Sequence, residues 1–559
     1  MIDELKKIIT KALNNQGITS LVVNLTHPEN ISFGDFTTNI ALVYSKELKT
    51  SPKQLADKIV EELNKNKIDE IESISIAGPG FINFKLKDSY FANEILNLEK
   101  KGNEIDRINM DKGRKVMVEY TDPNPFKIFH IGHLMANTVG EAISRIVEFS
   151  GADIIRACYQ GDVGLHVAKT IWAIMKDGKF QSNVKYLGDM YVVGNNKYDE
   201  DEIAKKEIIE INKKIFEKSD SKINEIYEEG RRISLEYFDG IYKKLGTKFN
   251  NFFFESEVAD DGVKIVREFL VKGVFQESDG AVIFPGEKFG EHTRVFINSQ
   301  GLPTYEAKEL GLTKQKFDMY PDLSESIVVT ANEQSAYFKV VIAAMKEIRP
   351  EYASKMKHLS HGLLRPSSGK MSSRKGNIVS ADDLISEFEE LVEQKITDRE
   401  FTSEEKVEIK NQIAIAGLKY TILRQLIGGD IIYDPNKAVS FEGDSGPYLQ
   451  YSAVRANAII AKSSEIKKVE ALPDKVDTLE KLLVRFPEII ERARMEYAPH
   501  HIITYLTELS SAFNLYYANN QIIDEKDPIS PYRVLVTKLF AQIMTNGLWV
   551  LGIKVPKRM

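Results

Sequence analysis

The sequence predicts an α/β protein in three parts, and three observations support that prediction. Two apolar runs at residues 71–86 follow helix-like stripes, which is typical of an α+β unit. From Lys115 onward, strand-like runs alternate with helical periodicity, which favours a parallel sheet. After Phe441 the patterns are those of amphipathic helices. We therefore expect an N-terminal α+β domain at residues 1–108, a central α/β domain at 109–439 and an all-α domain at 440–559.

The composition is that of a large globular protein from a reducing compartment. A chain of 559 residues, 43% of them hydrophobic, suffices for several well-packed domains. Cys158 is the only cysteine, which excludes an internal disulfide framework. The N-terminus lacks the apolar core of a signal peptide, so we expect a cytoplasmic protein without membrane segments. The net charge of −7 gives no global positive field, yet a nucleic acid can still bind to one basic face.

The N-terminal stretch shows local structure but no chemistry. Apolar residues at helical spacing cover residues 2–13, and a short strand is expected at 21–25. Ser51-Pro52 begins another helix that continues to Leu63. The segment AGPGFINFKL at 77–86 is typical of a strand, a turn and a second strand.

The segment VMVEYTDPNPFKIFHIGHL, at residues 116–134, opens the central domain. An apolar strand breaks at a proline-rich turn, and His130 and His133 stand at the head of a helix expected to end near Ser150. A second strand at 154–159 completes a βαβ unit. The N-terminus of a helix attracts phosphate, and two imidazoles three residues apart share one face and can donate to phosphoryl oxygens. This arrangement predicts a nucleoside triphosphate site at the carboxyl edge of the sheet.

Two other interpretations of the paired histidines remain open on this evidence. They can be capping or packing residues, which this pattern alone does not distinguish from a phosphate site. A zinc site is the weaker alternative, because the first histidine is not followed by glutamate and no third ligand stands at a recognisable spacing. We therefore expect no metal bound by protein side chains.

Beyond the first βαβ unit, residues 178–293 are polar and lysine-rich, and we expect them to form a helical insertion. The α/β pattern resumes with a strand-like run at Val295 to Ile297. Tyr305 and Glu309 follow one helical turn apart, so they share a face. A strand at 327–329 precedes Gln334, a residue that can also cap the next helix.

Residues 370–377, KMSSRKGN, combine glycine, hydroxyl groups and three cations, which suits a cover over a triphosphate. A basic loop is more often only solvated, so this composition is weak evidence by itself. Taken with His130 and His133, the segment resembles the paired ATP signatures of class I aminoacyl-tRNA synthetases. The strings FGDFTTNIA, IAGPGFINFKL, GPYLQYSAVRA and MTNGLWVLGIKVPKRM closely resemble the arginyl-tRNA synthetases, so the resemblance covers nearly the whole chain.

The resemblance implies a Rossmann-like catalytic domain, an N-terminal domain that contacts tRNA and an α-helical anticodon-binding domain. His130, His133 and Lys370 are the implied catalytic residues. Ser373 stands where the family usually has the second lysine of its signature, so Arg374 and Lys375 are candidates to compensate. The residues implied for ATP binding are Pro123, Asn124, Lys127, His130, Gly132, His133, Lys370, Met371, Ser372, Ser373, Arg374 and Lys375.

A guanidinium is planar and permanently charged and has five N–H donors, so its pocket needs carboxylates and neutral acceptors. The resemblance assigns this role to Glu119, Asn124, Tyr305, Glu309 and Gln334. Taken singly, each of these residues is more often an ordinary surface or core residue. The sequence departs from the family at Glu309, where aspartate is usual, and at Tyr337, where histidine is usual.

The implied reaction is ATP-dependent formation of arginyl-adenylate and transfer of the arginyl group to the 3′-terminal ribose of tRNA(Arg). Mg²⁺ is expected with the nucleotide, and the protein is expected to be a monomer. Tyr448, Tyr451 and Arg455 are candidate tRNA contacts, since aromatic side chains stack on unpaired bases. The alternatives are a glutamyl or cysteinyl synthetase, a small-molecule adenylyltransferase and a non-catalytic tRNA-binding relative.

Overall fold

The computed structural model describes residues 1–18, 22–28, 30–65, 67–102, 108–367, 380–397, 400–463 and 468–559. The chain forms two compact units, which we describe separately. The first unit comprises Met1–Ile105, Ser463–Arg485 and Leu515–Leu539, and the second comprises Asp106–Lys462, Phe486–Asn514 and Phe540–Met559. No helix in the described ranges is both long enough and apolar enough to span a bilayer.

The first unit is an antiparallel sheet covered by helices, in the order β1-β3-β2. Its apolar core includes Leu5, Ile9 and Ile59 from the helices and Phe84 from the central strand. The expected strand at 21–25 is absent from its described residues, 22–25, and only Thr26 forms an isolated bridge to Thr37. The elements are α1 (Ile2–Asn14), β1 (Phe36–Thr38), α2 (Ile40–Tyr44), α3 (Pro52–Lys65), β2 (Ile71–Ala77), β3 (Phe81–Leu86), α4 (Asp88–Lys101) and α18 (Thr478–Val484).

A buried carboxylate connects the sheet of this unit to α18. Asp35 is 1% exposed, accepts a hydrogen bond from the Leu86 backbone N–H at 2.8 Å and forms an ion pair with Lys481 at 2.9 Å. The Lys481 ammonium also lies 4.9 Å from the centroid of the Phe91 ring. The aspartate of the FGDF string therefore has a structural role within the unit, because a buried charge needs such partners.

The second unit is built on a five-stranded parallel sheet in the order β11-β10-β4-β5-β6. The first strand in sequence, β4, lies between β5, which follows it, and β10, which comes much later. Ligands in such sheets bind where the strand order reverses, and this point falls at the carboxyl ends of β4 and β10. The strands are β4 (Lys115–Tyr120), β5 (Asp153–Gln160), β6 (Asn251–Phe254), β10 (Leu323–Ala331) and β11 (Met356–His361).

Two expectations about the middle of the chain are wrong. The segment 178–293 is not wholly an insertion, because β6 lies inside it and pairs with β5 from Ala157 to Gln160. The expected strand at 295–297 forms, but it belongs to a separate antiparallel sheet of β7 (Gln276–Ser278), β8 (Ala281–Phe284) and β9 (Arg294–Ile297). In both cases a short apolar run can predict a strand, but it does not indicate with which other strand it pairs.

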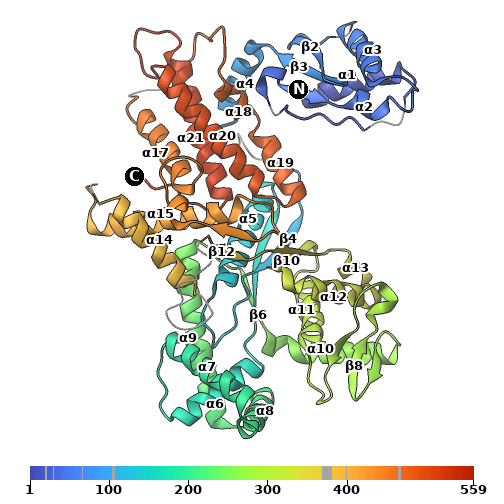
Figure 1. Cartoon of the computed structure of the whole chain (residues 1–559), viewed down its shortest axis with the longest axis vertical. Helices are drawn as coiled ribbons and strands as arrows, with labels where there is room; N and C mark the ends of the chain where they lie inside the picture. Colours follow the sequence, from blue (N-terminus) through green and yellow to red (C-terminus); the bar gives the residue numbers. More distant parts are fainter. Residues whose placement is uncertain are drawn as a thin grey trace. The chain divides into compact units, whose positions relative to one another are not determined.

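Helices cover the sheet and form two outlying groups. Figure 1 shows α6, α7 and α8 together, with α9 leading back toward the sheet, and α10, α11 and α12 grouped near β8. The two-stranded pair β12 (Leu364–Pro366) and β13 (Ile431–Tyr433) is parallel. The first helices of the unit are α5 (Ile131–Phe149), α6 (Leu165–Asp177), α7 (Val184–Glu200), α8 (Glu202–Glu217), α9 (Ser221–Leu245), α10 (Glu255–Val271), α11 (Tyr305–Met319), α12 (Ser335–Ile348) and α13 (Pro350–Ala353).

The later part of the unit is helical, as expected. Its helices are α14 (Ala381–Lys395), α15 (Ser403–Leu423), α16 (Pro435–Ala438), α17 (Gly446–Ile460) and α19 (Phe486–Glu496); α20 (His500–Asn519) and α21 (Ser530–Val550) have residues in both units. The α/β character, the parallel sheet and the helical C-terminal part predicted from the sequence are confirmed.

Three helices hold the last turn of α21 and the segment after it through main-chain carbonyl groups. Arg145 of α5 donates to the Trp549 carbonyl at 2.9 Å, Lys419 of α15 to the Gly552 carbonyl at 2.7 Å and Gln450 of α17 to the Lys554 carbonyl at 2.6 Å. Lys419 is 1% exposed, and burial lowers its pKa to about 7. We call these three contacts the carbonyl clamp.

Candidate active site

A cavity of about 1160 Å³ lies at the carboxyl ends of the central strands. Its wall includes Thr121 and Asp122 after β4, Tyr159 of β5, Val329 of β10 and His361 of β11. Eight of the predicted site residues line it together: Glu119, Asn124, His130, Gly132, His133, Tyr305, Glu309 and Gln334.

Some predicted residues lie elsewhere. Pro123 is buried in the turn and is not part of the cavity wall, and the Lys127 ammonium lies 4.6 Å from the centroid of the Tyr191 ring. Lys370, Met371, Ser372, Ser373, Arg374 and Lys375 fall outside the described residues. The two residues that bracket this segment are close to the site, since Ser367 lines the cavity and Ser380 forms a β-bridge with His130.

The turn after β4 has an unusual backbone. Thr121, Asp122 and Phe126 have φ angles of 83°, 45° and 69°, and each such residue other than glycine costs about 1–3 kcal/mol. Side-chain contacts hold the turn in this shape: the Asp122 carboxylate accepts the Tyr159 N–H at 2.8 Å, and Asn137 donates to the Thr121 hydroxyl at 3.0 Å. The surrounding structure thus fixes the loop that separates β4 from the histidine helix.

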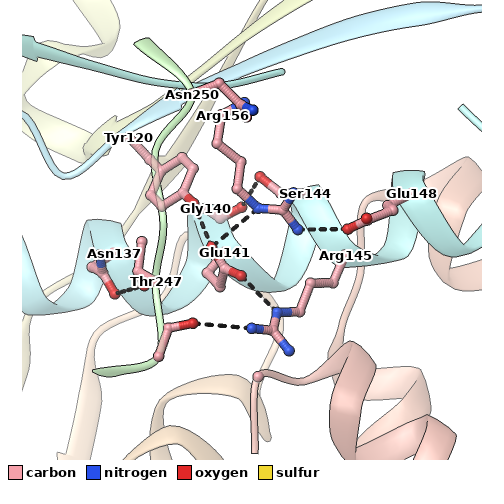
Figure 2. A network of polar contacts seen from close by, with 12 residues as sticks. Tyr120, Asn137, Gly140, Glu141, Ser144, Arg145, Glu148, Arg156, Thr247 and Asn250 are labelled. Atoms are coloured by element: carbon pink, nitrogen blue, oxygen red, sulfur yellow. Dashed lines mark hydrogen bonds and ion pairs between the residues drawn. The ribbon is translucent and has the colours of Figure 1, made fainter. Parts of the chain in front are cut away.

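A polar network behind this turn holds β4 against α5 (Figure 2). The Tyr120 hydroxyl donates to Glu141, whose other oxygen accepts from Arg145 at 2.6 Å. Arg156 of β5 also forms an ion pair with Glu141, at 3.4 Å. Tyr120 packs so closely on Gly140 that a Cβ there would lie 2.2 Å from the ring. The network therefore fixes the strand end next to Glu119 relative to the helix that carries His133.

The two histidines cap α5 and each other. His130 Nδ1 accepts from the N–H groups of Gly132 at 3.1 Å and His133 at 3.4 Å, while His133 Nδ1 accepts from the His130 N–H at 3.3 Å. The two rings stack with centroids 3.6 Å apart. The capping interpretation and the phosphate interpretation are thus compatible, because capping uses only one nitrogen of each ring.

Both imidazoles are neutral near pH 7. Burial, and then the charge of Lys127, lowers the pKa of His130 to about 4. Burial and the neighbouring His130 hold the pKa of His133 well below its usual value. A neutral imidazole whose Nδ1 accepts must carry its proton on Nε2, an assignment that follows from the hydrogen bonds. Each ring therefore retains one N–H donor for a ligand in the cavity.

Three buried glutamates, Glu119, Glu255 and Glu309, also line the cavity. Glu119 forms a buried ion pair with Lys316 at 2.9 Å, and Glu255 forms another with Lys308 at 2.5 Å. Glu309 is 3% exposed, and its Oε1 atom has no hydrogen-bond partner among the described residues. Two of the three glutamates are thus paired internally, which leaves Glu309 as the carboxylate able to take a cationic ligand.

The electrostatics of this pocket follow from burial. Burial raises the pKa of Glu309 to about 7; Lys316 opposes this rise, and Glu119 adds to it. Burial and Glu119 also raise the pKa of Asp122 well above its usual value. For Lys316 burial alone would lower the pKa, but Glu119 and Glu309 hold it above the usual value. A bound cation would relieve the crowding of carboxylates around Glu309.

The family descriptions that match the chain cover each of its parts. "Arginyl tRNA synthetase N terminal domain" matches residues 3–86, and "DALR anticodon binding domain" matches 449–559. "tRNA synthetases class I (R), catalytic domain" matches residues 94–434, more than half of the chain. The chain belongs to the class I arginyl-tRNA synthetases.

Relatives and solved structures agree with this membership. The arginine–tRNA ligase of Treponema denticola is 30% identical over 553 residues and covers 93% of each chain. That of Parabacteroides distasonis is 28% identical over 587 residues and covers 98% of each. The arginyl-tRNA synthetase of Thermus thermophilus has the same fold, with a TM-score of 0.81, 23% identity and full coverage of both chains.

The reaction of this arginyl-tRNA synthetase is the ATP-dependent charging of tRNA with arginine. The predictions of family, fold and reaction are confirmed. The glutamyl, cysteinyl, adenylyltransferase and non-catalytic alternatives are excluded, because the matched descriptions and the curated relatives name arginine.

Several residues that shape the pocket of this arginyl-tRNA synthetase were not identified from the sequence. Asp122, Tyr159, Glu255 and Tyr337 line the cavity, and Lys316 pairs with Glu119 beneath it. Lys316 could have been found, because it lies seven residues after Glu309, which is two helical turns and the same face. The others come from separate elements and carry no local signal.

The predicted tRNA contacts lie on α17. The Tyr448 hydroxyl accepts from Asn514 at 2.9 Å, and Arg455 donates to the same side chain at 3.4 Å. Tyr451 is 36% exposed. Tyr448 and Arg455 thus make contacts within the protein, and Tyr451 is the most accessible of the three for stacking on a base.

Proposed function

We propose that the cavity binds ATP and L-arginine side by side and forms arginyl-adenylate. The arginine carboxylate attacks the α-phosphate in line and pyrophosphate leaves; the 3′-terminal ribose hydroxyl of tRNA(Arg) then takes the arginyl group. One observation carries this proposal: a single cavity is lined by two neutral imidazole donors at a helix N-terminus and by Glu309, whose buried Oε1 atom has no hydrogen-bond partner among the described residues. The imidazole donors suit phosphate and the carboxylate suits a cation.

The ATP side is proposed to act by positioning and by stabilising negative charge. His130 and His133 donate from Nε2 to phosphoryl oxygens, and the N-terminus of α5 at Gly132 adds its dipole. Asn124 also lines this cavity. Mg²⁺ arrives as the counter-ion of the ATP phosphates. The proposal retains Pro123 and Lys127 of the turn and Lys370, Met371, Ser372, Ser373, Arg374 and Lys375 of the signature segment as ATP contacts, with Lys370 first for the pyrophosphate.

The arginine side is proposed to recognise a guanidinium through Glu309 and Tyr305. Both residues belong to the first turns of α11 and line the cavity. Glu119 contributes negative potential, although Lys316 already pairs with it. Asn124 and Gln334 supply neutral acceptors, and the Gln334 side chain makes no capping hydrogen bond to α12. This set matches the donor pattern of a planar cation.

The remaining parts of the proposal concern partners. Tyr448, Tyr451 and Arg455 are proposed to face the anticodon region of tRNA(Arg). A monomer acting in the cytoplasm is proposed as the working form, and light scattering of the purified protein tests its mass.

Arginine-dependent exchange of labelled pyrophosphate into ATP tests the proposed chemistry. We expect exchange with arginine, stimulated by tRNA(Arg), and none with glutamate or cysteine in its place. Exchange with another amino acid, or none in the presence of arginine, ATP and tRNA(Arg), would overturn the proposed chemistry.

A further inference from the structure

Tyr337, on α12, connects two residues proposed to bind arginine. Its hydroxyl lies 3.1 Å from the Tyr305 carbonyl oxygen and 3.5 Å from Glu309 Oε2. Tyr305 and Glu309 are one turn apart on α11, so one hydroxyl from a different helix spans that turn. The hydroxyl has a single hydrogen, so the two oxygens compete for it: the Tyr305 carbonyl is the closer acceptor, and Glu309 becomes the stronger one when it is ionised.

Opposing influences act on the ionisation of the Glu309 carboxyl group. Lys316 favours its ionised form, while burial and the other carboxylates favour the protonated form. Lys316 pairs with Glu119 and Lys308 with Glu255, and none of the described residues forms an ion pair with Glu309. The titratable groups that interact with it are Glu119 of β4, Asp122 of the following turn, Tyr159 of β5, Glu255 of α10, Lys316 of α11 and Tyr337 of α12. Tyr305 of α11 and His361 of β11 line the same cavity, and Lys308 of α11 pairs with Glu255.

We propose that Tyr337 is a positioning residue for arginine recognition, which holds Glu309 Oε2 so that Oε1 receives the guanidinium, and that arginine binding displaces a proton from Glu309. The inference rests on the proposed function of the cavity. In the step, the carboxyl O–H bond of Glu309 breaks, its proton passes to solvent and the carboxylate forms a charge-assisted hydrogen bond with the substrate cation. Nothing is oxidised or reduced, and the charge within the pocket is unchanged.

Proton release by the unmodified protein is the first test. The pKa of Glu309 is about 7 before arginine binds, and the guanidinium lowers it in the complex. Calorimetry of arginine binding near pH 7, in two buffers of different ionisation enthalpy, should show a net release of protons, up to about one per arginine bound. Arginine affinity should rise as pH increases from about 6 to about 8 and then level off.

Tyr337→Phe is the second test, because it removes only the hydroxyl. Without that donor the pKa of Glu309 rises further, so arginine binding near pH 7 should weaken by up to about tenfold. Binding should recover near pH 8, and kcat at saturating arginine should change little. Tyr352→Phe is the matched control, since that ring stacks on Phe317, is not part of the cavity wall and should leave the pH profile unaltered.

The outcomes separate this inference from the proposed function. If arginine binds and supports exchange but releases no proton, or if Tyr337→Phe weakens binding equally at every pH, the role of Tyr337 is wrong and the cavity keeps its function. If the unmodified protein binds no arginine, the proposed pocket itself is wrong. The calorimetric result with the unmodified protein does not depend on how well the variant folds.

Discussion

Replacing His133 by alanine is expected to lower the rate of arginyl-adenylate formation by about a hundred- to a thousandfold, which corresponds to about 2.7–4 kcal/mol in the transition state. The His133 ring is already fixed by stacking on His130 and by its capping hydrogen bond, so little free energy is needed to orient its Nε2–H toward the phosphate. The measurement is the single-turnover rate of adenylate formation with tRNA(Arg) present. Binding of tRNA(Arg) should change by less than about twofold.

A control separates catalysis from folding. His133 Nδ1 also caps α5, so its loss removes about 1 kcal/mol of helix stabilisation. His501→Ala is the matched control, because His501 is not part of the cavity wall and its ring hydrogen-bonds to Glu496. Equal losses of adenylate formation and tRNA binding in His133→Ala would show that the residue acts through folding and not through ATP.

Glu309→Gln is expected to weaken arginine binding by about thirtyfold or more, because losing one partner of a buried charge pair costs about 2–5 kcal/mol. An amide keeps the shape of the side chain but cannot neutralise the guanidinium. Affinity for ATP should stay within about twofold of the original value. Calorimetry with each ligand separately measures both. Unchanged arginine affinity would remove Glu309 from the pocket.

Glu119→Gln is the informative comparison. This substitution should also weaken arginine binding and leave ATP affinity nearly unchanged. In addition, it removes the charged partner of the Lys316 ammonium, and Lys316 is only 2% exposed. Breaking a buried pair in this way typically costs about 3–5 kcal/mol of folding free energy. We therefore expect thermal unfolding at a clearly lower temperature for Glu119→Gln than for Glu309→Gln. The two carboxylates would then differ in role, one mainly structural and the other mainly for recognition.

The features that the sequence predicts well depend on residues that lie close together in the chain. The strand, turn and helix around His130 follow from periodicity and capping rules within 20 residues, and Tyr305 and Glu309 share a face because they are one turn apart. The parallel sheet follows from the alternation of strands and helices. These features need no knowledge of distant residues.

The features that sequence patterns miss depend on distant contacts. The strand β6 is a short aromatic run among helices, and only its pairing with β5 assigns it to the central sheet. The Glu119–Lys316 pair and the contact of Tyr337 with Glu309 join different elements, so no spacing rule predicts them. The consequence is specific: part of the cavity wall was predictable, but the ion pairs that engage Glu119 and Glu255, and leave Glu309 without one among the described residues, were not.

The carbonyl clamp has a consequence for how the chain can vary. Arg145, Lys419 and Gln450 all donate to main-chain oxygens of residues 549–554, so most side chains in that stretch can change without disturbing these hydrogen bonds. Two positions are constrained: the centroid of the Trp549 ring lies 5.0 Å from the Arg145 guanidinium, and Gly552 has a φ of 69° and the Lys419 ammonium 2.8 Å from where a Cβ would lie. Adding or removing one residue there would instead move the carbonyl acceptors away from their donors. The stretch should therefore tolerate substitutions far better than insertions or deletions.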